Sequence, residues 1–130
     1  MSELRGVTVL VVEDDEDTRE VLRVMLEMCG ARVICAGSAR DGLQTFRREH
    51  PQAIVSDIAM PGEDGLGLLR RLRSLPASEG GLTPAVALTA HAGTEQRIQT
   101  LSAGFQIHVP KPVQPAELVA VVANLAGRTR

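Results

Sequence analysis

Apolar runs of strand length alternate with segments of helical period along almost the whole chain. The first run, residues 7–12, is continuous and rich in β-branched residues, which is typical of a strand buried on both faces. Further runs of this kind lie at 31–36, 53–57, 85–90 and 105–109. Segments with apolar residues at helical spacing lie between and after them, at 17–30, 39–50, 64–75, 94–104 and 115–127. This strict alternation predicts parallel strands with helices on both faces of the sheet.

The predicted fold is therefore α/β, of the flavodoxin-like, doubly wound (βα)5 type. Its five parallel strands would take the order 2-1-3-4-5, which makes the first and third strands neighbours where the order reverses. The length of 130 residues predicts a single domain over 1–130, with a core at about 6–126.

Local chemistry predicts how two of the helices begin and which face of the first is buried. Asp15 and Asp17 would favour the positive end of the first helix dipole. Ser38, followed three residues later by Asp41, predicts a capping box at the start of the second helix. The buried stripe of the first helix is expected to comprise Val21, Leu22, Met25 and Met28.

Composition excludes several classes of function. A formal net charge of -2 gives no general basic field for nucleic acid, and Phe46 and Phe105, as the whole aromatic content, argue against base stacking. Cys29 and Cys35 form no zinc pattern and are expected to be free thiols. No apolar run approaches the ~20 residues of a membrane span, and the first residues lack a signal-peptide core. A cytoplasmic protein is expected.

Polar residues gather at the predicted strand ends, where ligands bind in an open parallel sheet. The second strand ends at Ala36 without a reactive group, and in the predicted order it lies at the edge, outside the other four. The first strand ends at Glu13, Asp14 and Asp15, and the third ends at Asp57. The fourth strand ends at Thr89, and Lys111 follows the fifth.

Like charges this close repel one another and are costly to bury, so a cation must compensate for them. Oxygen ligands without His or Cys suit Mg²⁺, which binds one or two carboxylates together with phosphate oxygens. A lysine adds a positive charge, and a threonine adds a hydroxyl donor. These are the groups required to move a phosphoryl group onto an aspartate.

Four segments in order, "VLVVEDDEDTRE", "IVSDIAMPGEDG", "ALTA" and "PKPV", together resemble the receiver domain of two-component response regulators. The resemblance covers nearly the whole chain and is strongest to receivers at the ends of hybrid sensor histidine kinases. It implies that Asp57 is the phosphoacceptor. It also implies a magnesium site made by Glu13, Asp14, Asp57 and the backbone carbonyl of Ala59.

The resemblance assigns roles at the last two strand ends as well. Thr89 would hydrogen-bond a phosphoryl oxygen, Lys111 would pair with it, and the peptide bond before Pro112 would be cis. The chain departs from the family at His108, where many receivers carry Tyr or Phe. We expect His108 either to alter the coupling of Thr89 to the output face, with a dependence on pH, or to have no switching role. Ala59 offers no functional group, so the lifetime of the phosphoryl group stays open.

The implied function is that of a phosphoacceptor in a two-component phosphorelay. Phosphoryl transfer from a phosphohistidine to Asp57 would switch the face made by the fourth helix, fifth strand and fifth helix. The partners would be a histidine kinase or histidine phosphotransfer protein, with a receiver–receiver dimer possible. The domain would turn over no external substrate and so would not be an enzyme.

Two other functions compete with this one. The first is a receiver-like scaffold that acts without phosphorylation. The second is an aspartate-nucleophile phosphatase of the haloacid-dehalogenase type, which normally needs a second aspartate where this chain has Ala59.

Smaller expectations concern the remaining polar and turn residues. The basic run Arg70, Arg71 and Arg73 would form a solvated face or a partner patch. Pro61 and Gly62 are expected to form a turn, and Met60 is expected to pack in the interior. His50 and His91 are expected at the surface, and the tail is expected to be frayed.

Overall fold

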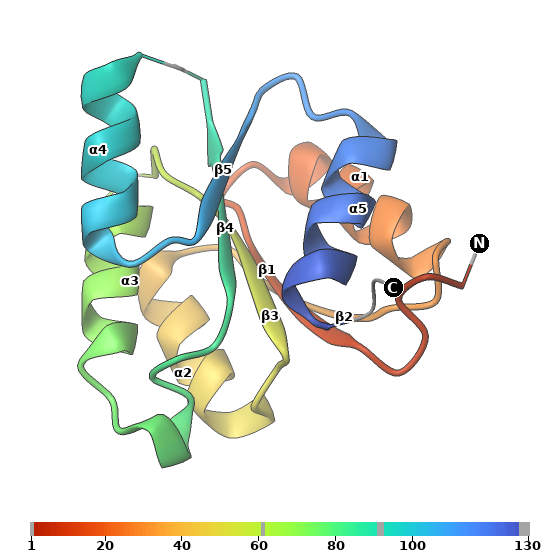
Figure 1. Ribbon diagram of the computed structural model, residues 1–130, viewed down its shortest axis with the longest axis horizontal. Coiled ribbons are helices and arrows are strands. Elements are labelled where there is room, and N and C mark those ends of the chain that lie inside the picture. The colour runs from red at the N-terminus through yellow and green to blue at the C-terminus, as the bar shows by residue number, and fades with distance from the viewer. Residues whose placement is uncertain (1, 61, 91–92, 128–130) are drawn as a thin grey trace.

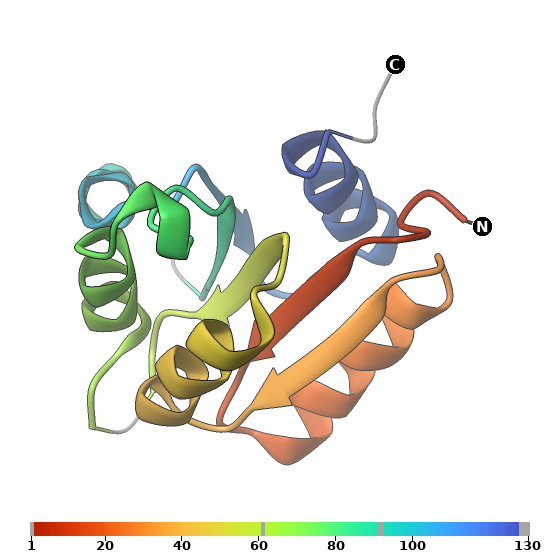
Figure 2. The ribbon, with the colours of Figure 1, turned by 90° about the horizontal axis from the view of Figure 1, so that it is seen from below.

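The computed structural model describes residues 2–60, 62–90 and 93–127, which form one parallel sheet with helices on both sides (Figures 1 and 2). The strand order is β2-β1-β3-β4-β5, as the sequence predicts. The strands are β1 (Thr8–Val12), β2 (Arg32–Ala36), β3 (Ala53–Asp57), β4 (Ala85–Thr89) and β5 (Ile107–Pro110). The helices are α1 (Glu16–Glu27), α2 (Ala39–Glu49), α3 (Gly65–Arg73), α4 (Thr94–Ala103) and α5 (Pro115–Leu125), and a short 3₁₀ helix (Ala77–Glu79) precedes β4.

The sheet carries an apolar core on each face, because successive side chains of a strand point to opposite sides. On β1, Val9 and Val11 belong to the core shared with α1 and α5. Leu10 and Val12 belong to the opposite core, shared mainly with α2 and α3. Helices α1 and α5 therefore cover one face of the sheet, and α2, α3 and α4 cover the other (Figure 1).

Side-chain caps begin three of the helices. The carboxylate of Asp15 accepts a hydrogen bond from the Thr18 backbone N–H at 2.9 Å, so Asp15 caps α1. Ser38 caps α2 in the same way, and its hydroxyl accepts from the Asp41 N–H at 3.1 Å, as expected for half of a capping box. Asp64 caps α3. These caps fix where each helix leaves the carboxyl edge of the sheet.

The buried face of α1 differs from the predicted stripe. Leu22 is buried as expected, but Val21 is 52% exposed and Met28 is 61% exposed. Leu26, one turn after Leu22, takes the buried position instead. Val21 and Met28 line an open apolar groove of about 860 Å³ between α1 and α5. The apolar arc of α1 is therefore wider than the part that contacts the sheet.

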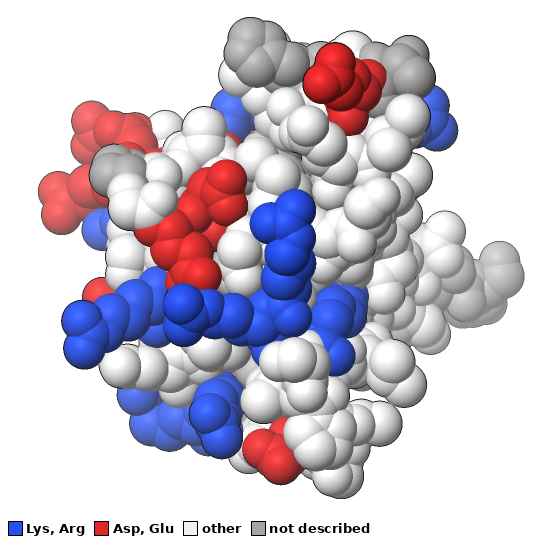
Figure 3. Space-filling view, turned by 90° about the vertical axis from the view of Figure 1, so that its left-hand side faces the viewer, with Lys and Arg blue, Asp and Glu red and all other residues white. Residues whose placement is uncertain are grey.

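Helices α3 and α4 lie on the side of the molecule that faces the viewer in Figure 3, where Lys and Arg side chains form a band with acidic side chains beside it. Arg70 is exposed. The Arg71 Nε lies 2.7 Å from Oε2 of Glu63, in the loop before the helix. The run is thus divided between a solvated residue and a residue paired within the chain.

Arg73, the last residue of α3, joins several segments. Its guanidinium donates hydrogen bonds to the carbonyl oxygen of Gly104 at 2.8 and 3.0 Å and to that of Gly81 at 3.0 Å. It also donates to Oε1 of Gln106 at 3.1 Å. The half-buried cation therefore connects α3 to the loop before β4 and to the turn between α4 and β5.

Single residues for which the sequence predicts a turn, core or surface position can be located in the structure. Met60 is buried, His50 is exposed, and Gly62 has the positive φ of a turn residue. Pro61, His91 and the tail at 128–130 lie outside the described residues. Within the described ranges, no helix has the length and apolar character needed to cross a bilayer.

Candidate functional site

The polar strand ends meet at one edge of the sheet, because parallel strands bring their carboxyl ends together. Asp57 is the last residue of β3 and Thr89 the last of β4. Glu13 directly follows β1, and Lys111 directly follows β5. The second strand, which the sequence leaves without a reactive end, lies at the edge of the sheet. The fold thus gathers the side chains that the sequence singles out.

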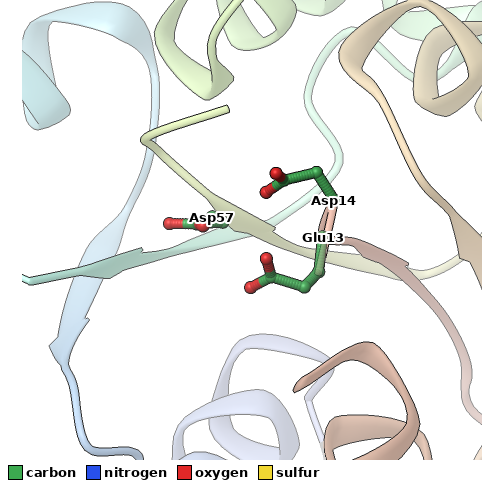
Figure 4. A group of neighbouring side chains, drawn as sticks. All are labelled: Glu13, Asp14 and Asp57. Atoms are coloured by element: carbon green, nitrogen blue, oxygen red, sulfur yellow. The ribbon is translucent and has the colours of Figure 1, made fainter. Parts of the chain in front are cut away.

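Three carboxylates form the centre of the site. Glu13, Asp14 and Asp57 each offer an oxygen atom, and these oxygen atoms all lie within 4.8 Å of one another. Figure 4 shows the carboxylates of Glu13 and Asp14 projecting from the end of β1 beside Asp57 on β3. Glu13 and Asp57 are buried, whereas Asp14 is exposed. The cluster is therefore open to solvent on the Asp14 side.

Lys111 supplies positive charge to the two buried carboxylates of the cluster. Its Nζ lies 3.1 Å from Oδ2 of Asp57 and 3.6 Å from Oε1 of Glu13. Burial lowers the pKa of Lys111, but its contacts with the two carboxylates raise that pKa by more. The net shift is upward, so the ammonium group stays charged at neutral pH.

Glu13 is the most strongly buried acid of the site, with 1% of its surface exposed. Burial raises the pKa of its carboxyl, and the negative charge of Asp57 acts in the same direction. The Asp15 N–H, which donates to Oε2 of Glu13 at 3.1 Å, and the charge of Lys111 offset only part of this effect. The charged form of Glu13 is therefore under-stabilised by the protein alone.

Two buried oxygen atoms of the site lack a hydrogen-bond partner among the described residues: Oε1 of Glu13 and Oγ1 of Thr89. The 3.6 Å separation of Glu13 Oε1 from Lys111 is an ion pair but is too long for a hydrogen bond. Such atoms are rare in folded proteins and commonly mark the place of a ligand or an ion. The oxygen-rich donor set suits Mg²⁺, so the residues present fit a divalent cation.

The other predicted site residues lie close by. The backbone N–H of Ala59 donates to Oδ1 of Asp57 at 3.3 Å, while a metal-binding role for its carbonyl stays a prediction. The Lys111–Pro112 peptide bond is cis, as expected. His108 lies half-buried on β5 in register with Ala87, and its role also stays a prediction.

Three residues support the site although the sequence reading gave them no role in it. Arg19 donates to the carbonyl oxygen of Glu13 at 2.8 Å, and the Ser56 hydroxyl donates to the carbonyl of Asp57 at 2.9 Å. A Cβ on Gly65 would lie 2.3 Å from the same Asp57 carbonyl, so only glycine lets α3 start this close to β3. Spacing in the sequence alone does not reveal the contacts of Arg19 and Ser56.

Comparison with known families gives one match over most of the chain. A family model described as the response regulator receiver domain matches residues 9–123. The uncharacterized 14.6 kDa protein in the sodA1 3′ region of Leptolyngbya boryana is 47% identical over 122 residues, which are 94% of this chain and 92% of that protein. Of other curated relatives, the chain spans from 18% to about half of the length.

Solved structures of receiver domains agree with this chain in fold. The receiver domain of the Francisella response regulator 1452 has a TM-score of 0.85 and 30% identity, over 96% of this chain and all of that one. The receiver domain of a sensor histidine kinase from Pseudomonas aeruginosa PAO1 has the same TM-score and identity, over 94% of this chain and 98% of that one. That structure contains a magnesium ion coordinated in its active-site cleft.

Proposed function

The chain belongs to the response regulator receiver family of two-component systems, and we propose that Asp57 is the residue on which it accepts a phosphoryl group. The observation that carries this assignment is the contact of 3.1 Å between Lys111 Nζ and Oδ2 of Asp57, beside the buried and unpaired hydroxyl of Thr89. A positive charge thus contacts a carboxylate that ends a strand at the open edge of the sheet, and a hydroxyl without a partner among the described residues ends the neighbouring strand.

The proposed reaction is transfer from a phosphohistidine. An oxygen of Asp57 attacks phosphorus, the P–N bond breaks, and its electron pair returns to the imidazole nitrogen of the donor. The product is an acyl phosphate on Asp57. Glu13, Asp14 and Asp57 would hold the magnesium ion, whose chemical contribution is to neutralise charge on the phosphoryl oxygens. Lys111 pairs with a phosphoryl oxygen and stabilises the charge that the transfer brings into the site.

Thr89 would transmit the change. Its hydroxyl, which lacks a partner in the described structure, would donate to a phosphoryl oxygen once Asp57 is modified. Thr89 ends β4, so its movement would reach the segment that leads to α4. The output face would be made by α4, β5 and α5, with His108 on β5 modifying the coupling.

The proposed activity is a single modification rather than steady turnover of an external substrate. Ala59 stands where the phosphatases weighed above need a second aspartate, and it supplies no acid or base. The domain would phosphorylate itself from a donor and lose the phosphoryl group slowly by hydrolysis. It would therefore act as a switch and not as an enzyme.

Receiver domains receive the phosphoryl group from a histidine kinase or a phosphotransfer protein, and we propose one of these as the partner here. Pairing of two receivers is a second proposed interaction. The net charge of -2 supports a protein partner rather than direct contact with nucleic acid. A cytoplasmic location would give the chain access to such donors.

The decisive experiment is incubation with acetyl phosphate or phosphoramidate, with and without Mg²⁺, followed by intact-mass measurement. We expect the mass of one phosphoryl group to be added to each chain only with Mg²⁺, and to be lost in Asp57→Asn. Asp17→Asn, which removes an exposed acid of α1, is the matched control and should be modified like the wild type.

The other functions give different results in this experiment. A scaffold that acts without phosphorylation would show no mass gain under any condition. A phosphatase would release phosphate from a phosphomonoester continuously and would retain none. Either result would remove the proposed function.

A further inference from the structure

Arg19 contacts the backbone of the acidic cluster, whereas Lys111 contacts its carboxylates. Its Nη1 donates to the carbonyl oxygen of Glu13 at 2.8 Å, and this carbonyl belongs to the peptide that joins Glu13 to Asp14. The Glu13 N–H is already paired with the carbonyl of Ala36 at 3.1 Å, at the end of the β1–β2 ladder. Both backbone groups of Glu13 are therefore fixed, one by the sheet and the other by Arg19.

The Arg19 side chain lies in a confined position rather than extending into solvent. It is 23% exposed, and its one ion pair among the described residues, with Glu16, is 4.0 Å long and reaches a carboxylate that is 91% exposed. Such a pair contributes little to stability. The contact with Glu13 is much shorter, so it determines where the guanidinium lies.

Gly37 makes room for this position. A Cβ built on Gly37 would lie 3.2 Å from Nη1 of Arg19, which is tighter than ordinary contact. Gly37 is not among the residues of positive φ, so the backbone alone does not require glycine here. The end of β2, to which the sequence reading gave no chemistry, thus leaves the space that the guanidinium needs.

We propose that Arg19 is a positioning residue for the divalent-cation site, which rests on the function proposed above. By holding the carbonyl of the peptide between the two acids, it fixes the directions in which the Glu13 and Asp14 carboxylates point. Rotation of that peptide would turn both carboxylates away from Asp57. Partners that orient metal ligands in this indirect way typically contribute 10- to 100-fold in metal affinity, as an order of magnitude.

Isothermal titration calorimetry of the unphosphorylated protein with Mg²⁺ tests the proposal, since the chain has no Trp or Tyr for a fluorescence assay. We expect Arg19→Met to weaken Mg²⁺ binding about tenfold and Arg19→Lys to restore most of the affinity. Arg23→Met is the matched control, because Arg23 lies one turn later on α1 and pairs only with Glu20 and Glu27 among the described residues. It should bind Mg²⁺ like the wild type.

Gly37→Ala separates position from charge, because it keeps the guanidinium but narrows its space. We expect a partial loss of Mg²⁺ affinity in Gly37→Ala and none in Gly93→Ala, whose added methyl group would meet nothing within 4 Å. Wild-type affinity in Arg19→Met would overturn the proposal. The proposal would also be overturned if Gly37→Ala bound Mg²⁺ with wild-type affinity while Arg19→Met bound it more weakly. Arg19 would then act through its charge alone.

The result also distinguishes this inference from the function on which it rests. If the wild-type chain binds no Mg²⁺, the proposed magnesium-dependent function fails first. If the wild type binds Mg²⁺ and is phosphorylated while Arg19→Met behaves identically, only the role of Arg19 fails. Thermal unfolding in a chelator identifies any variant that is merely misfolded. The Mg²⁺ affinities of the folded variants then decide whether Arg19 positions the site.

Discussion

Glu13 is a buried acid whose ionised form costs stability when no cation is present. Burial raises its pKa above the value in the unfolded chain, so the folded protein disfavours the ionised form of Glu13. The stability that a raised pKa provides is present at low pH and is lost as the pH rises through the folded pKa. Once the pH is above the folded pKa, the metal-free protein therefore bears the cost in full.

Glu13→Gln should for this reason increase the free energy of unfolding of the metal-free protein at neutral pH, by about 1 kcal/mol. The amide is neutral but keeps an oxygen that can accept the Asp15 N–H. The advantage over the wild type should shrink as the pH falls below the ordinary glutamate pKa, where both states of the wild type are protonated. Urea unfolding of both proteins at several pH values, in a chelator, measures this difference in the free energy of unfolding. An advantage that grows toward acid pH would contradict the burial argument.

His108 is a single ring at a position where the family resemblance predicts Tyr or Phe. It lies half-buried on β5. If its charge alters the coupling of Thr89 to the output face, His108→Phe should remove the pH dependence of the phosphorylation-induced NMR shifts of α4 and β5 between about pH 6 and pH 8. Identical pH profiles for wild type and variant would assign His108 no switching role.

At the scale of elements, Arg73 is the side chain that ties separate segments together. Its guanidinium satisfies the carbonyl oxygens of Gly104 and Gly81 and the side chain of Gln106. Removing a hydrogen-bonding partner leaves part-buried acceptors unsatisfied, which costs more than the bonds themselves contribute. The joint is therefore sensitive to truncation.

Arg73→Met should lower the free energy of unfolding by about 2 kcal/mol. Arg70→Met, which truncates an exposed arginine of the same helix, should change it by less than about 0.5 kcal/mol. Chemical denaturation of the two variants makes the comparison. Equal effects would show that the contacts of Arg73 contribute no more than helix-surface packing.

The sequence predicted the elements well because alternation and strand-end chemistry are local patterns. The stripe of α1 was wrong in part: Leu26 is buried, whereas Val21 and Met28 line the groove beside α5. Helical period identifies an apolar arc but not which part of a wide arc meets the sheet. That choice depends on the angle at which α1 packs, which the full tertiary structure sets.

At the scale of the whole molecule, the same logic explains what could be predicted of the site. Parallel topology brings the carboxyl ends of the strands to one edge of the sheet, so the sequence alone could place Asp57, Thr89 and Lys111 together. Arg19 could not, because its role depends on the path of a long side chain past Gly37 to a backbone carbonyl. Unlike the cap that Ser38 provides at the start of α2, this contact between a side chain and a backbone carbonyl carries no spacing signature in the sequence.

Cation binding should stabilise the whole fold, because the site exists only in the folded chain. Mg²⁺ at about 100 times its dissociation constant should add about 2.7 kcal/mol to the free energy of unfolding, and a chelator should reverse the gain. Asp14→Asn should lose most of this gain, whereas Asp17→Asn should keep it. Thermal melts with and without Mg²⁺ measure both. A gain of equal size in Asp14→Asn would place the ion elsewhere.

The two ends of α4 are held unequally. The helix runs at its C-terminal end into Gly104, whose carbonyl Arg73 binds, whereas Gly93, the residue before its first turn, gives it no side-chain cap among the described residues. The lightly held end is the one that follows Thr89 along the chain. If phosphorylation of Asp57 displaces Thr89 as proposed, we expect α4 to tilt about its far end, and a partner that senses this tilt would contact the first turn of the helix rather than the last.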